Sequence, residues 1–198
     1  MKVAVIGGGA AGFYAAICCK EFHPHASVTI YEKTTKLLSK VKISGGGRCN
    51  VTHDAKYPSD LAKNYPRGGK QLKKHFKSFN NHHIIKWFES RGVALKVEPD
   101  GRMFPTTDRS QTIIDTFMTE VNKLGIEIKM KSALTRIEHS EGQLELSIND
   151  QKILFDAVII ATGGSNSEVA IAGLRMWGTR SLSRFHRCLP LICPRSRL

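Results

Sequence analysis

The chain lacks several features that would assign it to a specialised class of protein. It has no Cys-x-x-Cys pair and an odd number of cysteines, five, which argues against zinc-ribbon, dithiol-redox and disulfide-scaffold proteins. No apolar run approaches the ~18 residues that a membrane span needs. The first apolar run ends in glycines after Ile6, unlike a cleavable signal. We therefore expect a cytoplasmic protein with no membrane partner.

Acidic residues are also scarce. The 198 residues include 30 Lys and Arg against 17 Asp and Glu, a net charge of +13, and the 41% of apolar residues suffices for a folded domain. The basic residues are unevenly distributed, because all 18 lysines lie at or before Lys152 whereas 6 of the 12 arginines lie in residues 165–198. We therefore expect residues 165–198 to be an atypical Arg-rich tail.

The start of the chain predicts a strand, a helix and a second strand. Residues 2–6 and 27–31 are short, β-branched apolar runs, typical of strands buried on both faces of a parallel sheet. Residues 10–21 between them are rich in alanine and favour a helix. Residues 157–161 form another buried run. This arrangement indicates an α/β fold with a Rossmann-like, doubly wound parallel sheet.

A glycine motif joins the first strand to the helix. Gly7 permits a tight turn, Gly9 lets the backbone approach a pyrophosphate, and Gly12 allows close packing of helix on strand. Glu32 follows 20 residues after Gly12, where it can bind ribose hydroxyls and would repel the 2′-phosphate of NADP. The motif residues are Gly7, Gly8, Gly9, Ala10, Ala11 and Gly12. The motif predicts binding of FAD or NAD without separating them.

The middle of the chain mixes loops, helices and strands. Breaker residues predict loops over residues 34–68, and apolar spacing predicts two helices within residues 69–91, divided at Asn80 and Asn81. Short strands are expected at residues 93–97 and 102–104, a helix at 110–124, and an antiparallel β-meander over 126–155 that crosses to the last parallel strand.

Three further motifs resemble one family. They are residues 40–52 (KVKISGGGRCNVT), residues 101–105 (GRMFP) and residues 161–164 (ATGG). Together with the glycine motif they resemble the HI0933-like family of bacterial FAD-dependent oxidoreductases over residues 1 to about 164. The resemblance implies a glutathione-reductase-like FAD domain and a two-electron (hydride) transfer, with NAD(P)H as a possible electron donor and an unknown small-molecule substrate.

The resemblance also implies a set of FAD-binding residues. The ADP half of FAD would be held by the glycine motif and Glu32. The phosphates and ribose would lie near Lys33 and Lys40, the adenine near the backbone of Leu134, and Thr162 and Gly163 would close over the cofactor. The remaining members of the set are Gly45, Gly46, Gly47, Arg48, Cys49 and Asn50.

The glycine run of this set has a physical rationale of its own. Consecutive glycines expose backbone N–H groups as an anion nest, and Arg48 adds a fixed charge for a phosphate or a reduced flavin. Cys49 has no resolving thiol nearby, which favours a structural role. No catalytic residue is predicted, and no metal site either, because the pairs His23/His25 and His82/His83 lack a third ligand.

The C-terminal part departs from the family pattern. We expect residues 1–164 to be an FAD-binding domain that is incomplete relative to the family, and residues 165–198 to be the Arg-rich tail. The change in composition after Gly164 suggests the hypothesis of an out-of-frame or truncated terminus, in which case the chain could be an inactive fragment.

Two other functions remain open at this stage. One is a non-enzymatic basic protein that binds nucleic acid or another polyanion through residues 70–86 and the tail. No recognition-helix or RNA-binding signature accompanies these lysines, so our first interpretation has no nucleic-acid partner. The other is an NAD-binding enzyme without flavin.

Overall fold

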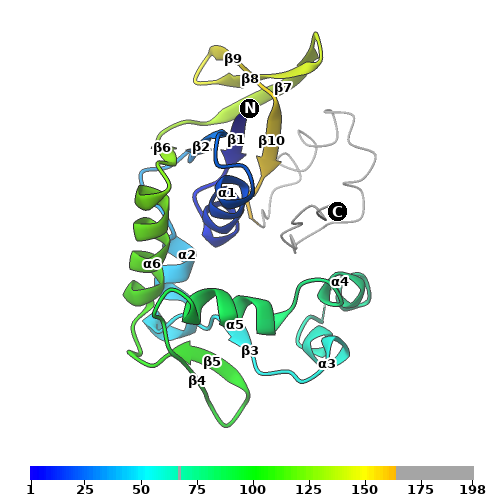
Figure 1. The fold of residues 1–198 in the computed structure, drawn as a ribbon, viewed down its shortest axis with the longest axis vertical. Coiled ribbons are helices and arrows are strands. Elements are labelled where there is room, and N and C mark those ends of the chain that lie inside the picture. Colours follow the sequence, from blue (N-terminus) through cyan, green and yellow to red (C-terminus); the bar gives the residue numbers. More distant parts are fainter. Residues whose placement is uncertain (67, 164–198) are drawn as a thin grey trace. The chain divides into compact units, whose positions relative to one another are not determined.

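The computed structural model describes residues 1–66 and 68–163. They form two compact units (Figure 1). The first unit comprises residues 1–38 and the described residues from 119 onward, and the second unit comprises Ser39–Met118. The Arg-rich tail and Gly164 lie outside the described residues, so the expectations for them stay expectations.

The first unit is built on a four-stranded parallel sheet. Its strands are β1 (Lys2–Ile6), β2 (Ser27–Tyr31), β6 (Glu127–Lys129) and β10 (Ala157–Ile160), in the order β10-β1-β2-β6. β1 and β2 are buried after their first residues, which explains their continuous apolar sequence. The predicted α/β fold with a Rossmann-type parallel sheet is confirmed.

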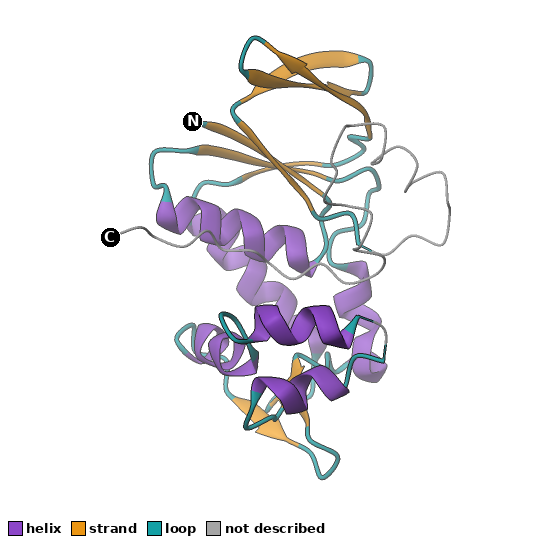
Figure 2. Ribbon diagram, turned by 90° about the vertical axis from the view of Figure 1, so that its right-hand side faces the viewer, coloured by secondary structure: helices purple, strands orange, loops and turns teal. Residues whose placement is uncertain are grey.

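A helix and a meander cover the two faces of this sheet (Figure 2). Helix α1 (Ala10–Phe22) packs on β1, β2 and β10. The antiparallel meander of β7 (Leu134–Ser140), β8 (Gln143–Ile148) and β9 (Gln151–Phe155) lies on the other face. Its fully buried Phe155 meets Tyr31 edge-on, with ring centroids 5.9 Å apart. This layer joins the meander to the sheet through one apolar core.

One strand of the expected meander has a different partner. Residues 126–130 were expected to be antiparallel, but β6 pairs in parallel with β2, and the Thr29 hydroxyl donates to Glu127 at 3.1 Å. β6 is the edge strand of the sheet and only partly covered, so its polar and apolar residues alternate as they do in a meander. The antiparallel part is therefore limited to β7, β8 and β9.

The second unit combines helices with a small antiparallel sheet, in the order β3-β5-β4. Its elements are α2 (Ser39–Ile43), the 3-10 helix η1 (Ser44–Gly47), β3 (Thr52–His53), α3 (Pro58–Lys63), α4 (Gly69–Phe76), α5 (Asn81–Glu89), β4 (Leu95–Val97) and β5 (Arg102–Pro105). Helix α6 (Ser110–Lys123) runs from this unit into the first. The rings of Trp87, Phe88 and Phe117 form the aromatic core of the second unit.

Two predictions for the second unit have different outcomes. The two helices divided at Asn80 are confirmed, and the Asn80 side chain caps α5 by accepting from the His82 N–H at 3.1 Å. The loop expected over residues 34–68 is wrong in part, because α2, η1, β3 and α3 lie there. These elements have two to six residues, too few to show a periodic apolar pattern.

Candidate cofactor site

The glycine motif brings three backbone segments into close contact. Gly7 has a φ of +117°, and its N–H donates to the Tyr31 carbonyl at 2.8 Å. A Cβ on Gly7 would lie 2.4 Å from the carbonyl oxygen of Ala161, and a Cβ on Gly12 would lie 1.9 Å from the carbonyl oxygen of Gly7. Only glycine therefore fits where β1 turns into α1 beside the end of β10.

Gly9, unlike Gly7 and Gly12, has room for a side chain. It is the N-cap of α1 with a φ of −93°, and a Cβ placed on it would meet no atom of the described residues within 4 Å. No side chain caps this helix end, and its first turn, which begins with Ala10 and Ala11, carries no acidic residue. Among the described residues the first backbone N–H groups of α1 therefore have no capping side chain, and the positive end of the helix dipole lies behind them, as an anion site requires.

Glu32 lies beside this opening, at the end of β2. One carboxylate oxygen accepts from the Gly8 N–H at 2.8 Å and the other from the Thr34 N–H at 2.8 Å. Burial alone would raise the pKa of Glu32, but these two hydrogen bonds outweigh it and hold the pKa below its ordinary value. The ionised carboxylate keeps lone pairs free to accept hydrogen bonds from hydroxyl groups.

The other predicted residues of the first unit lie in three places. Lys33 follows β2 and is exposed. Thr162 and Gly163 are exposed directly after Ala161, and a Cβ on Gly7 would lie 3.1 Å from the Thr162 nitrogen. Leu134 begins β7 at a register irregularity and packs against the meander core. Thr162 and Gly163 therefore adjoin the glycine motif directly.

The second unit holds the rest of the predicted set. Gly45, Gly46 and Gly47 have φ values of +56°, +69° and +87°, so the glycine run is left-handed throughout. A Cβ on Gly45 would lie 2.6 Å from the Phe104 ring. Lys40 on α2 and Asn50 after the run are exposed. The predicted residues therefore form two groups, one in each unit.

Arg48 has carboxylate partners inside the second unit. Its guanidinium pairs with Glu98, lies 3.6 Å from Asp108, and stacks 4.1 Å from the centroid of the Phe104 ring. The hydrogen bond that Arg48 donates to Glu98 raises the pKa of Arg48 further. Sequence reasoning missed Glu98 and Asp108, and the available signal was their position on either side of the GRMFP motif in a chain with few acids. The Arg48 charge is thus already neutralised by its neighbours.

The Cys49 thiol is unsuited to nucleophilic chemistry. Cys49 is buried, its φ is +66°, and its N–H donates to the Ser44 carbonyl at 2.9 Å. Burial raises the pKa of the thiol, only partly opposed by a hydrogen bond with Ser44, so the protonated form is favoured. Within the described residues no group of three His, Cys, Asp or Glu could hold a metal, and no helix could span a bilayer.

The fold and these motifs match one protein family. The sequence pattern of the family described as "HI0933-like protein Rossmann domain" matches residues 1–174. The chain belongs to the HI0933-like family. The predicted resemblance is confirmed, and the predicted cofactor, FAD, agrees with it.

Several proteins are similar to this HI0933-like chain. A 3-dehydro-bile acid delta(4,6)-reductase of Clostridium scindens is 26% identical, over 84% of this chain and 40% of the relative. A ribosomal RNA dihydrouridine synthase of Haemophilus influenzae is 25% identical, over 98% of this chain and 47% of the relative. A Rhodococcus jostii 3-ketosteroid-delta4-(5alpha)-dehydrogenase shares the fold, with a TM-score of 0.58, 15% identity and coverage of 82% and 45% of the two chains. The chain spans less than half the length of these curated relatives.

Proposed function

We propose that this HI0933-like chain binds FAD and serves a two-electron oxidoreductase. The observation that carries the proposal is the open, uncapped N-terminus of α1 at Gly9, with the Glu32 carboxylate fixed beside it. Backbone N–H groups suit a pyrophosphate, and a carboxylate at the end of the second strand suits ribose hydroxyls. The residues present therefore fit the ADP half of the cofactor.

Each group of residues has its own part in this proposal. The glycine motif binds the pyrophosphate, Glu32 accepts from a ribose hydroxyl, and Lys33 supplies positive charge. Thr162 and Gly163 close over the cofactor, and Leu134 contacts the adenine through its backbone. In the second unit the N–H groups of Gly45–Gly47, with Lys40, Cys49 and Asn50, form a separate group of proposed cofactor contacts. Arg48 holds this run in place through Glu98 and Phe104.

The bound flavin supplies hydride transfer, while the protein supplies binding and orientation. We infer that a reduced nicotinamide is the electron donor and that the acceptor is a small molecule with a reducible double bond. The reductase name of the Clostridium scindens relative supports this substrate class. A cytoplasmic location belongs to the same proposal, because the described cysteines are free thiols.

The flavin content of the purified chain tests the proposal. We expect a yellow protein whose extracted chromophore is FAD, and an apoprotein that binds FAD more tightly than NADH. Glu32→Ala should weaken FAD binding, and Glu127→Ala, an exposed carboxylate on the sheet edge, is the matched control. A colourless protein that binds NADH more tightly than FAD would overturn the proposal and favour an NAD-binding enzyme.

A further inference from the structure

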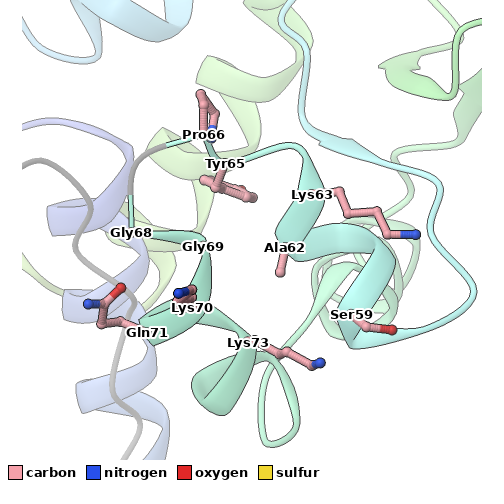
Figure 3. Close-up of a pocket in the computed structure, with 10 residues that line it drawn as sticks. All are labelled: Ser59, Ala62, Lys63, Tyr65, Pro66, Gly68, Gly69, Lys70, Gln71 and Lys73. Carbon is pink, nitrogen blue, oxygen red and sulfur yellow. The ribbon is translucent and has the colours of Figure 1, made fainter.

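The second unit contains a pocket that the proposed flavin site does not use. The pocket has a volume of about 460 Å³ and lies between α3 and α4, which pack against each other (Figure 3). Residues of both helices line it, together with Tyr65, Pro66 and Gly68 between them. No residue of the proposed flavin set is among the lining residues. Its volume falls within the range of small-molecule sites.

Three lysines surround this pocket. Lys63 ends α3, and Lys70 and Lys73 lie one turn apart on α4 (Figure 3). Lys63 pairs with Asp60 at 2.9 Å. For Lys70 and Lys73 the structure records no ion pair within residues 1–66 and 68–163, and α4 contains no acidic residue. Like charges at i and i+3 repel one another, so a ligand with two negative charges would relieve this repulsion.

The start of α4 adds backbone donors to the same pocket. Gly68 is the N-cap with a φ of +80°, and no side chain caps this helix end. The Leu72 N–H donates to the Gly68 carbonyl at 2.9 Å, so the three N–H groups before it have no acceptor within the helix. They belong to Gly69, Lys70 and Gln71, which line the pocket. Lysine ammonium groups and helix N–H groups are both established donors to phosphate.

Another part of the pocket wall is apolar. The Tyr65 ring packs against Phe76, with ring centroids 5.4 Å apart, and Ala62 and Pro66 also line the pocket. A Cβ on Gly69 would lie 2.9 Å from the Ala62 carbonyl oxygen, so a glycine lets α4 begin this close to α3. A phosphate group fills only a few times the roughly 30 Å³ of a water molecule, which leaves room for an organic portion against this wall.

We propose that this pocket binds a small phosphate monoester. Lys70 and Lys73 supply positive charge, the first N–H groups of α4 donate hydrogen bonds, and the wall at Tyr65 contacts the organic portion. A monoester carries close to two negative charges at neutral pH, which suits two ammonium groups better than the single charge of a phosphodiester. The inference goes beyond the proposed function, because it involves no residue of the proposed flavin site.

Titration of the full chain with phenyl phosphate, followed by calorimetry in a buffer without phosphate or sulfate, tests the inference. We expect saturable binding that weakens below about pH 6, where the monoester loses its second charge. Methyl phenyl phosphate, a diester with one charge, should bind at least about fivefold more weakly. Vesicles that contain phosphatidic acid distinguish a soluble ligand from a lipid headgroup, and the chain should not be retained on them.

Two double variants of α4 locate the site. Lys70→Gln with Lys73→Gln should weaken binding of phenyl phosphate at least about tenfold. Lys74→Gln with Lys77→Gln makes the same charge change at the same spacing outside the lining residues, and should bind within about twofold of the unmodified chain. In the unmodified chain, phenyl phosphate should shift the amide NMR signals of Lys70 and Gln71.

Several results would overturn the inference. They are an equal loss in both double variants, unchanged binding by the first variant with native circular dichroism, and equal affinity for the monoester and the diester. Retention on the phosphatidic acid vesicles without binding of phenyl phosphate would overturn it as well. So would unshifted amide signals of Lys70 and Gln71, or no saturable binding up to about 10 mM phenyl phosphate.

Discussion

Two glycines three residues apart should respond in opposite ways to the same substitution. Within residues 1–66 and 68–163 a Cβ on Gly9 would meet no atom within 4 Å, and the φ of −93° at Gly9 suits alanine. Loss of a glycine N-cap costs about 0.5–1 kcal/mol, and the reduced entropy of the unfolded chain returns about 0.4–1 kcal/mol. Gly9→Ala should therefore leave the melting temperature within about 3 °C, at about 2–4 °C per kcal/mol.

The cost of Gly9→Ala should appear in cofactor binding. The added methyl group occupies the open space before the first turn of α1, where a phosphate would approach the N–H groups. Loss of one hydrogen bond to a charged group costs about 1.5–3 kcal/mol, which weakens binding roughly 10- to 150-fold. Titration of the apoprotein with FAD, followed by flavin fluorescence, measures this change.

Gly12→Ala should instead destabilise the fold. Its Cβ would lie 1.9 Å from the backbone oxygen of Gly7, so α1 must move away from β1. Overpacking costs about 1–3 kcal/mol even where side chains can adjust, and here the obstacle is backbone. We expect a loss of about 3 kcal/mol or more, a fall of at least about 6 °C in melting temperature. Native FAD affinity in Gly9→Ala, or a native melting temperature in Gly12→Ala, would refute the reasoning.

Three further perturbations follow from the described contacts. The folded state lowers the pKa of Glu32, so as the pH falls the unfolded state takes up this proton first. The stability that the ionised carboxylate contributes is therefore lost as the pH falls from about 4.5 through the folded-state pKa. Glu32→Gln should flatten the fall in melting temperature over this range. Phe155→Ala should cost about 3–5 kcal/mol in urea unfolding, whereas Leu154→Ala, 42% exposed, should cost under about 1 kcal/mol; equal effects would contradict the packing described. Arg48→Gln and Glu98→Gln should each accelerate cleavage of the glycine run in limited proteolysis, and the double variant should be cleaved little faster than either single variant. Additive increases in the cleavage rate would show that the pair does not act as a unit.

The central strands and the glycine turn were predictable for a local reason. Strands buried on both faces must be apolar at every position, and a left-handed turn against backbone must be glycine. The structure of β1, β2 and the turn at Gly7 can therefore be predicted from adjacent residues in the sequence. The pairing of β6 cannot, because the residues of an edge strand alternate in the same way whether its neighbour is parallel or antiparallel.

The environment of Arg48 could not be predicted, because its partners are distant in sequence. Glu98 lies 50 residues further along the chain, and Phe104 and Asp108 follow it. The motifs containing Arg48 and Phe104 were both recognised, but no local sequence pattern indicates that the Arg48 guanidinium stacks on the Phe104 ring and pairs with a carboxylate there. The sequence indicated a free charge for a phosphate, while the structure contains a guanidinium stacked on a ring and bound to carboxylates.

The distribution of charge between the units determines how salt should affect the proposed cofactor site. Residues 1–38 and 119–163 carry nine basic and nine acidic residues, so the described first unit is neutral, whereas Ser39–Met118 carries 15 basic and seven acidic residues, a net charge of +8. The proposed pyrophosphate site of the neutral unit consists mainly of backbone N–H groups and one carboxylate, which release few bound ions. Between about 50 and 200 mM salt, FAD affinity should therefore change less than about threefold. A much steeper fall in FAD affinity over this range would mean that FAD binds mainly through the basic residues of Ser39–Met118.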